Sequence, residues 1–460
     1  MTDTVQPCIA GFAGEVITRG TLEFDQARTL WNAMIGRKPA VILRPRSTSD
    51  VVTAVRYARA QALPVAVKCG GHSAPGYSMC DDGVVIDLSL MQRVRVDPEA
   101  RAAWAQGGAL LRVLDAATQE YGLAVPAGAI SHTGMGGLIL GGGFGHIMRK
   151  YGLSIDNIIE AEVVLADGRV VRADEKHHPD LFWALRGGSG NFGVVTEFVL
   201  RCHPVGPLYV AAHIFELAGS REPLRAFREH MDQAAPDELA WMSFFRGAPD
   251  FPWVPRSLLG EPILMMPLIW AGDPAEGRDY IESLPGWSGG AIVSVSSVES
   301  YTALQSQWDE VFCHGRRHYA KAGFLTALPD ALLGNVVAHM AAVPSPHTQI
   351  EILRLGGAVA RFPADATAFP HRSAKWPVNI IGLWEDAAHD PENIGWVREA
   401  YDLLTPHLDG GVYVNYAGGE EAGGVRAAYG SAWDRLSEIK ASYDPDNMFR
   451  SNVNVRPRKQ

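Results

Sequence analysis

The chain has 460 residues, of which 47% are hydrophobic and 20% are charged. At roughly 150 residues per domain this length suggests about three lobes, and the composition excludes a disordered or fibrous chain. The 41 basic and 51 acidic residues give a formal net charge of −10, which argues against nucleic acid or an anionic membrane as the main partner.

The sequence shows no targeting or membrane segment. Its first residues lack a positive segment followed by an apolar run, and no window approaches 18 consecutive apolar residues, so neither a secretory signal nor a membrane span is expected. The five cysteines are odd in number and irregularly spaced, which indicates reduced thiols: Cys8, Cys69, Cys80, Cys202 and Cys313. We therefore expect a cytoplasmic protein.

The first half of the chain alternates predicted strands and helices. From about 38 to 105 the order is strand, helix, strand, and the helix at 47–61 opens with a Ser/Thr/Asp cap. From 106 to 204 the pattern predicts an amphipathic helix, then a hairpin around Asp167 and Gly168, then a strand at 192–203.

The composition changes after about residue 206. Trp, Met and Phe become frequent, as at 241–245 and 263–270, and helix-like stretches occur at 221–233 and 330–340. These residues are consistent with a second sheet that carries an apolar pocket, and equally with a plain hydrophobic core. After 420 a helix-like stretch precedes a polar tail.

Three glycine clusters stand out, at 68–76, 134–145 and 186–193. Such runs allow the backbone to approach a ligand and can cradle a pyrophosphate, although each alone is also explained by a tight turn. The third cluster contains a literal G-x-G-x-x-G. A helix-like stretch precedes it and a strand-like stretch follows, which is the reverse of a dinucleotide-binding turn. A P-loop is absent from the sequence.

His72 lies in the first cluster, directly after a predicted strand. A histidine between small residues at a strand end can serve as a base, a metal ligand or a covalent attachment point. The only suggestive metal spacing is His314 with His318, which lacks a nearby glutamate of the H-E-x-x-H kind. We therefore propose no metal site.

The motifs VKCGGHS at 67–73, PAGAISHTGMGGLILGGGFGHIMRKYGLSIDNI at 126–158 and YVNY…YDPDNMFRSNVNV towards the end resemble the berberine-bridge-enzyme branch of the vanillyl-alcohol oxidase superfamily. The match spans roughly 30–205 and 410–456. It implies an α+β fold with a two-lobed PCMH-type FAD-binding domain at 1–205 (lobes about 30–105 and 106–205). An α+β substrate domain with an antiparallel sheet at 206–412 would interrupt it, and a segment at 413–460 would return to the FAD domain.

The resemblance implies that His72 bonds covalently to the flavin. Many relatives attach it a second time through a cysteine eleven positions before the GGG run, but that position is Ile130 here. We expect a single covalent link through His72. The other residues expected at the cofactor are Lys68, Cys69, Gly70, Gly71, Ser73, Gly76, Ser131, Thr133, Gly134, Gly137, Gly143, Gly190, Val195, Asn415, Asn452 and Asn454.

Two residues carry the expected catalytic roles. Thr133 occupies the position thought to gate oxygen access in this family, or else it only hydrogen-bonds within a glycine-rich turn. Tyr416 matches the family's tyrosine base, or else it is a packing residue at a strand end. Because the tyrosine pKa is near 10, the hydroxyl is a poor base unless a cation or a neighbouring network lowers that pKa, and Arg354 and Lys321 are candidate cations.

We predict an FAD-linked oxidase that passes hydride to flavin N5 and electrons to molecular oxygen, giving hydrogen peroxide. The apolar block favours a small aromatic, polyketide-like or alkaloid substrate of secondary metabolism, oxidised at a C–OH or C–NH carbon. Alternatives are a carbohydrate oxidase, a flavin-dependent dehydrogenase and, remotely, a non-catalytic flavin-binding protein. Strand alternation suggests a substrate pocket of Trp241, Phe244, Met266, Trp270, Glu351 and Arg354.

Overall fold

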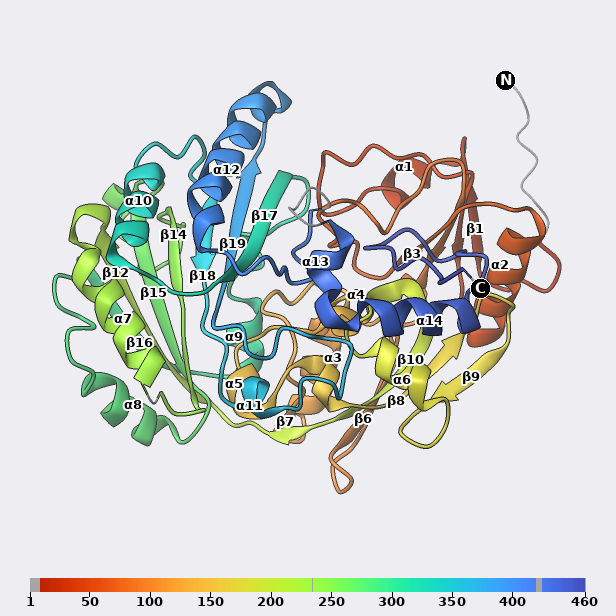
Figure 1. Ribbon diagram of the computed structural model, residues 1–460, viewed down its shortest axis with the longest axis horizontal. Helices are drawn as coiled ribbons and strands as arrows, with labels where there is room; N and C mark the ends of the chain where they lie inside the picture. Colours follow the sequence, from red (N-terminus) through yellow and green to blue (C-terminus); the bar gives the residue numbers. More distant parts are fainter. Residues whose placement is uncertain (1–8, 234, 419–423, 460) are drawn as a thin grey trace.

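The computed structural model describes residues 9–233, 235–418 and 424–459. It contains sheets of four, five and eight strands and one two-stranded ribbon. In Figure 1 the eight-stranded sheet, drawn mostly in green and cyan, stands beside the two smaller sheets, and the dark-blue C-terminal helices lie on the side of the smaller sheets. Cys8 lies outside the described residues; the other four cysteines are free thiols.

The four-stranded sheet has the order β1-β2-β4-β3, with β2, β4 and β3 parallel. Its elements are β1 (Glu15–Thr18), β2 (Val41–Arg44), β3 (Val65–Lys68) and β4 (Val84–Asp87), with helices α1 (Phe24–Ala27) and α2 (Thr48–Ala60). Helix α2 begins where the Ser47 side chain accepts a hydrogen bond from the Asp50 N–H group, as the predicted cap requires. Its apolar face packs between this sheet and the five-stranded one.

The five-stranded antiparallel sheet has the order β5-β6-β10-β8-β9. Its strands are β5 (Val94–Asp97), β6 (Ala102–Gln106), β8 (Ile158–Val164), β9 (Val170–Ala173) and β10 (Val194–Arg201). The β8–β9 hairpin turns at Gly168, where φ is 80°, which confirms the predicted turn. The ribbon pairs β7 (Leu123–Ala124) with β11 (His203–Pro204).

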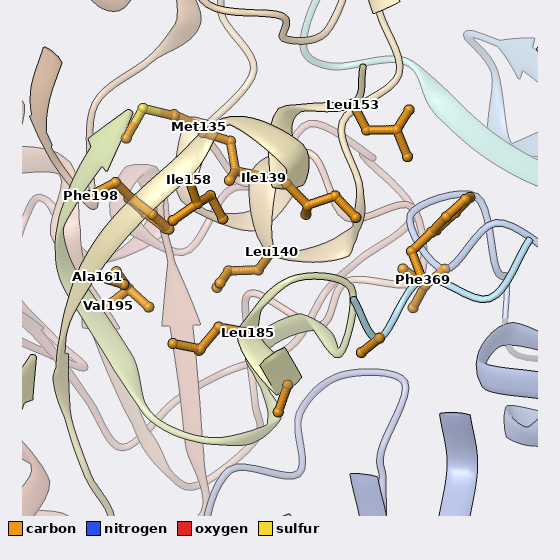
Figure 2. Packing of buried hydrophobic residues seen from close by; sticks show 14 of the residues in the cluster. Met135, Ile139, Leu140, Leu153, Ile158, Ala161, Leu185, Val195, Phe198 and Phe369 are labelled. Atoms are coloured by element: carbon orange, nitrogen blue, oxygen red, sulfur yellow. The ribbon is translucent and has the colours of Figure 1, made fainter. Parts of the chain in front are cut away.

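Helices α3 (Leu111–Gln119), α4 (Met135–Gly141), α5 (Met148–Tyr151) and α6 (Pro179–Leu185) belong to the same part of the chain. Figure 2 shows α4 side chains, among them Met135 and Ile139, packed against Phe198 of the five-stranded sheet. The third glycine cluster follows α6 and leads into β10, so its helix-to-strand order is as expected. These contacts fix the position of the glycine-rich start of α4.

The eight-stranded antiparallel sheet has the order β16-β12-β15-β14-β18-β19-β17, with β13 also paired to β15. Its strands are β12 (Leu208–Glu216), β13 (Leu239–Trp241), β14 (Ser243–Gly247), β15 (Pro262–Trp270), β16 (Val293–Glu299), β17 (Arg317–Leu325), β18 (Gln349–Ile352) and β19 (Trp376–Trp384). One face packs on the apolar sides of helices α7 (Arg221–Gln233), α8 (Pro274–Glu282), α10 (Asp330–Met340) and α12 (Asp390–Leu404). The opposite face packs in part on Ile147, Tyr301 and Trp308.

The chain then returns to the smaller sheets. Helices α13 (Val425–Tyr429) and α14 (Trp433–Tyr443) pack on the core beside α6, while the short α9 (Tyr301–Ser306) and α11 (Ala358–Arg361) contact α3 and α5. A fully buried pair anchors the C-terminal tail, because the Lys440 ammonium lies 2.6 Å from Asp444 and donates to the Phe449 carbonyl. Within the described residues no helix is both long and apolar enough to cross a membrane.

Candidate active site

A cavity of about 420 Å³ lies between the glycine clusters and the face of the eight-stranded sheet opposite helices α7, α8, α10 and α12. One side is mostly backbone, from the loop after β3, the start of α4 and the turn before β10. The other side is mostly side chains from β13, β14, β18 and β19. Segments far apart in the sequence therefore meet at one cavity.

The glycine side of this cavity is built by direct contact between backbones. A Cβ atom on Gly134 would lie 2.1 Å from the Gly70 nitrogen, so neither position accepts a side chain. Gly137 and Gly190 also line the cavity, yet a Cβ at either would meet no atom within 4 Å. The first pair is required for packing, whereas the second pair keeps space open beside the backbone.

His72 lies on this side with its ring held by aromatic neighbours. Trp31 stacks on it at a centroid distance of 5.3 Å and an interplanar angle of 14°. Its Nε2 atom lies 2.7 Å from Nδ1 of His132. Burial and the neighbouring His132 and His314 hold the pKa of His72 well below its usual value, so the ring is uncharged at neutral pH.

His132 was not singled out from the sequence, although it lies between Ser131 and Thr133 in a quoted motif. Asp309 fixes this segment: the Ser131 N–H and hydroxyl groups donate to its two carboxylate oxygens at 2.9 and 2.5 Å. His132 also lines a second cavity of about 580 Å³ with Lys68, Arg112 and His314. The ligand nitrogens of His72, His132 and His314 lie within 4.8 Å of one another, a grouping that the sequence spacing did not reveal.

Tyr416 and Glu351 form a hydrogen-bonded pair that lines the cavity from the opposite side. Burial raises the pKa of Glu351 to about 7, opposed by hydrogen bonds from Asn379, Tyr416 and Gln349. The Asn379 amide donates to Oε1 at 3.2 Å and the Gln349 amide to Oε2 at 3.3 Å. This carboxyl group is therefore poised to exchange a proton near neutral pH.

Neither candidate cation, Arg354 or Lys321, is among the groups that shift the pKa of the Tyr416 hydroxyl. Burial, and then the charge of Glu351, raise the pKa of Tyr416 well above its usual value. Arg354 instead lies 3.4 Å from Asp232 and donates to the Met231 carbonyl, while Lys321 lies 5.2 Å from the ring centre of Tyr401. The side chain that partners the tyrosine hydroxyl is therefore the Glu351 carboxyl group.

Only some of the residues predicted for the substrate pocket line the cavity. Phe244, Glu351, Arg354 and Trp241 line the cavity, but the Trp241 ring packs on Phe227 of α7. Met266 and Trp270 lie in the core between the sheet and its helices. The predicted alternation along β15 is off by one position, because the side chains at 264, 266, 268 and 270 face the helices.

The predicted cofactor residues divide in the same way. The cavity lining contains Cys69, Gly70, Gly71, His72, Ser73, Thr133, Gly134, Gly137, Gly190, Val195, Asn415 and Asn452. Five others lie outside that lining: Lys68, Gly76, Ser131, Gly143 and Asn454. Several of these have supporting contacts instead. The Lys68 ammonium donates to the Ala27 carbonyl, and the Gly143 N–H donates to the Tyr413 hydroxyl at 2.7 Å.

Further lining residues were not found from the sequence, among them Met242, Trp308, Asn379 and His146. His146 is buried, and its Nε2 atom has no hydrogen-bond partner. The cavity-facing positions of β13, β14 and β18 follow from strand register, for which the sequence carried no turn or motif signal. His146 directly follows the second glycine cluster, a position that could have been noted.

These residues fit a flavin. The open space at Gly137 and Gly190 allows an extended planar cofactor to lie against the backbone, and the uncharged His72 ring faces the same cavity. Asn452 donates to the Gly190 carbonyl at 3.0 Å, while its buried Oδ1 atom has no partner. An orphaned acceptor of this kind suits a ring N–H group.

Comparison with known proteins agrees with this fit. A family model described as an FAD binding domain matches residues 39–174, and one described as berberine and berberine like matches 412–456. An FAD-linked oxidoreductase of Dictyostelium discoideum is 30% identical over 461 residues, covering 99% of this chain and 97% of that protein. The (R)-6-hydroxynicotine oxidase of Paenarthrobacter nicotinovorans is 30% identical over 464 residues, with 96% and 97% covered.

The fold agrees as well. The solved structure of wild-type BBE-like 1 from Physcomitrella patens superposes with a TM-score of 0.88 at 22% identity, covering 98% of this chain and 99% of that one. The expected α+β architecture is therefore confirmed. Together with the full-length similarity to an FAD-linked oxidoreductase, this shows that the chain belongs to the berberine-bridge-enzyme-like family of FAD-linked oxidoreductases.

Proposed function

We propose that this oxidoreductase is an oxidase whose flavin is covalently linked to His72 and whose Glu351–Tyr416 pair takes the substrate proton. The observation that carries the proposal is that pair, hydrogen-bonded and buried in the cavity that His72 also lines. A hydride acceptor and a proton acceptor serving one cavity are what oxidation of a C–OH or C–NH carbon requires.

The glycine side would hold the cofactor. Gly137 and Gly190 would lie against its planar and phosphate-bearing parts, and Asn415 and Asn452 would offer amides to polar ring edges. When bound, the flavin supplies a two-electron acceptor at N5. Ile130 sits in an apolar cluster with Phe244 and has no atom able to form a second link, which supports attachment through His72 alone.

The proton route runs through two side chains. The high pKa of Tyr416 makes its hydroxyl a poor base by itself. Glu351, with a pKa near 7, can accept the tyrosine proton while the hydroxyl takes the proton of the substrate heteroatom. The two amides that donate to Glu351 keep its oxygens in place during the transfer.

The lining supports a small aromatic substrate. Phe244 and Trp308 contact each other at a centroid distance of 5.4 Å, and Met242 and Phe312 extend the same apolar surface. Apolar walls beside the Glu351–Tyr416 pair favour a ring that carries a reacting hydroxyl or amine. The relative named for oxidation of (R)-6-hydroxynicotine supports an aromatic amine or alkaloid in particular.

Thr133 would lie beside the cofactor, where its small side chain leaves room for oxygen. We propose molecular oxygen as the acceptor and hydrogen peroxide as the product. Reoxidation of the reduced protein slower than about 10² M⁻¹s⁻¹, far below enzyme ceilings, would instead identify a dehydrogenase.

The test is anaerobic bleaching of the yellow protein by panels of aromatic alcohols, aromatic amines and sugars, followed by peroxide measurement in air. The proposal expects bleaching by an aromatic member and peroxide on reoxidation. Bleaching by sugars alone would identify a carbohydrate oxidase, and no bleaching by any panel would identify a flavin carrier.

The proton acceptor is tested with the substrate so identified. Glu351→Gln should slow flavin reduction by roughly 10²- to 10⁴-fold, and Tyr416→Phe by a comparable factor, because each breaks the same route. The double variant should be little slower than either single one. Asp279→Asn, at an exposed carboxylate on α8, is the matched control and should reduce at the wild-type rate.

A further inference from the structure

The hydrogen-bond chain behind His72 defines which ring nitrogen is free to react. Nε2 of His132 lies 3.3 Å from the Asp309 carbonyl oxygen, which can only accept a hydrogen bond. In a neutral His132 this places the proton on Nε2 and leaves Nδ1 as an acceptor. Nε2 of His72, 2.7 Å away, must then be the donor. The bare nitrogen of His72 is therefore Nδ1.

The surroundings hold this arrangement. Trp31 stacks on the His72 ring and fixes its plane. The Asp309 carboxylate accepts two hydrogen bonds from Ser131, the residue before His132. His132 also lines the second cavity, beside the charged side chains of Arg112 and Glu310, whereas His72 lines the first. His132 therefore lies between the His72 ring and a second cavity that contains titratable side chains able to take up a proton.

We propose that His132 is a positioning residue that accepts the Nε2 proton of His72 while Nδ1 of His72 forms the bond to the flavin 8α-carbon. This rests on the proposed covalent link. The new bond joins Nδ1 to the 8α-carbon, and the bonds that break are one C–H at that carbon and the N–H at Nε2. Two electrons remain on the flavin, and molecular oxygen removes them with the two protons as hydrogen peroxide.

The same three histidine nitrogens could instead be read as a metal site. Two nitrogens bound to one tetrahedral zinc ion at 2.0–2.1 Å lie about 3.4 Å apart. The separation of 2.7 Å between His72 and His132 is that of a hydrogen bond. His314 makes ring contacts with both histidines, so a metal would need it whereas proton transfer would not.

The charged and titratable groups around His132 come from several segments. They are His72 and Lys68 near β3, Arg112 on α3, and Asp309, Glu310 and His314 in the segment after α9. The effect of His132 on attachment must therefore be separated from the effects of these neighbours. The variants below change only the group under test.

The experiment incubates flavin-depleted protein with FAD in air and measures flavin that stays with the polypeptide after acid precipitation. His132→Asn keeps an acceptor near Nδ1 but removes the basic nitrogen, and His132→Ala removes both. We expect attachment to slow by roughly 10²-fold in both variants, with rates that rise with pH as hydroxide replaces the lost base. His314→Ala, with or without chelator, should attach within about twofold of wild type.

A second readout uses the wild-type protein alone. Proteolysis should release a histidyl-flavin peptide joined through Nδ1, identified by NMR. Linkage through Nε2, or wild-type attachment rates in both His132 variants, would overturn the inference while leaving the covalent link intact. A requirement for His314 and metal would replace it with a metal site. Wild-type protein without acid-stable flavin would overturn the covalent link, and this inference with it.

Discussion

The two sides of the active-site cavity are built on different principles. The cofactor side is backbone, with Gly70 and Gly134 in direct contact and Gly137 and Gly190 left open. The substrate side is a sheet face on which Phe244, Glu351 and Asn379 lie opposite one another on three neighbouring strands. The cofactor side depends on residues that have no side chain. The substrate side depends on which side chains the strand register turns towards the cavity.

This difference has a consequence for how each side tolerates change. A glycine surface has no side chain to vary, so substitutions there add bulk in the space for the cofactor. A sheet face keeps its backbone pairing when a side chain is exchanged, so its chemistry can change without loss of fold. The cofactor side should therefore respond in flavin content, and the substrate side in reaction rate and pH dependence.

The largest expected effect tests the cofactor side. His72→Ala should abolish acid-stable flavin while flavin remains after native purification, because the glycine surface is unchanged. Cys69→Ser is the matched control, since burial raises the pKa of the Cys69 thiol to about 11 and leaves no thiolate to attach flavin. Intact mass before and after acid measures both variants. Acid-stable flavin in His72→Ala would show that another residue carries the link.

The cofactor side could be read from the sequence because its features are local. The three glycine clusters and His72 are short motifs whose order along the chain is specific, and the structure brings them to one cavity. Met266 and Trp270 were placed wrongly because alternation gives two faces but not which face is covered. That choice depends on helices α7 and α8, which contact the sheet only in the folded protein.

A contact that forms only in the folded protein also explains why Glu351 was not predicted as the partner of Tyr416. Glu351 lies 65 positions before Tyr416, and the two meet only when β18 and the segment between α12 and α13 come together in the fold. His132 was missed although it lies in a quoted motif, because its role depends on a contact with His72 sixty positions away. Pairings of this length leave no local signal in one sequence.

The next prediction concerns the pH dependence of stability at a contact between α3 and α9, which joins the two parts of the molecule. Asp115 on α3 accepts a hydrogen bond from Gln305 on α9, and burial raises its pKa to about 7. The unfolded value is about 3.9, so between pH 4 and 7 the folded state binds more protons and loses stability as the pH rises, by roughly 4 kcal/mol in total. Asp115→Asn should remove this slope.

Urea unfolding between pH 5 and 8 measures that slope, with the exposed Asp279→Asn as control. Equal pH dependence in Asp115→Asn and wild type would mean that the carboxyl group titrates normally. The contact between Asp115 and Gln305 would then contribute nothing to the pH dependence of the free energy of unfolding.

A smaller effect tests the open glycine positions. Gly137→Val should weaken FAD binding by about 2 kcal/mol, or roughly 30-fold, because the new methyl groups occupy cofactor space. Titration in the His72→Ala background, where flavin exchanges, measures this change. Gly334→Val on α10 also meets no atom and is exposed, so it should leave the affinity unchanged. Unchanged affinity in Gly137→Val would place the cofactor elsewhere.

The smallest effect tests the substrate side. Arg246 is fully buried, and its guanidinium donates to the Gln349 oxygen at 2.9 Å while the Gln349 amide donates to Glu351. Within the described part of the chain no carboxylate lies within ion-pair distance of Arg246, so its charge acts on Glu351 through one amide. Because this cation favours the ionised carboxylate, Arg246→Met should raise the pKa of Glu351 further.

Flavin reduction should then require a pH higher by about half a unit to one unit, since the base must be ionised to accept a proton. The pH profile of anaerobic reduction measures the shift, and Arg246→Lys should recover most of it by restoring the charge. An unchanged profile in Arg246→Met would mean that Asn379 and Gln349 alone set the proton affinity of Glu351. A loss of flavin content in the same variant would break the division between the two sides, because it would make a sheet residue part of the cofactor surface.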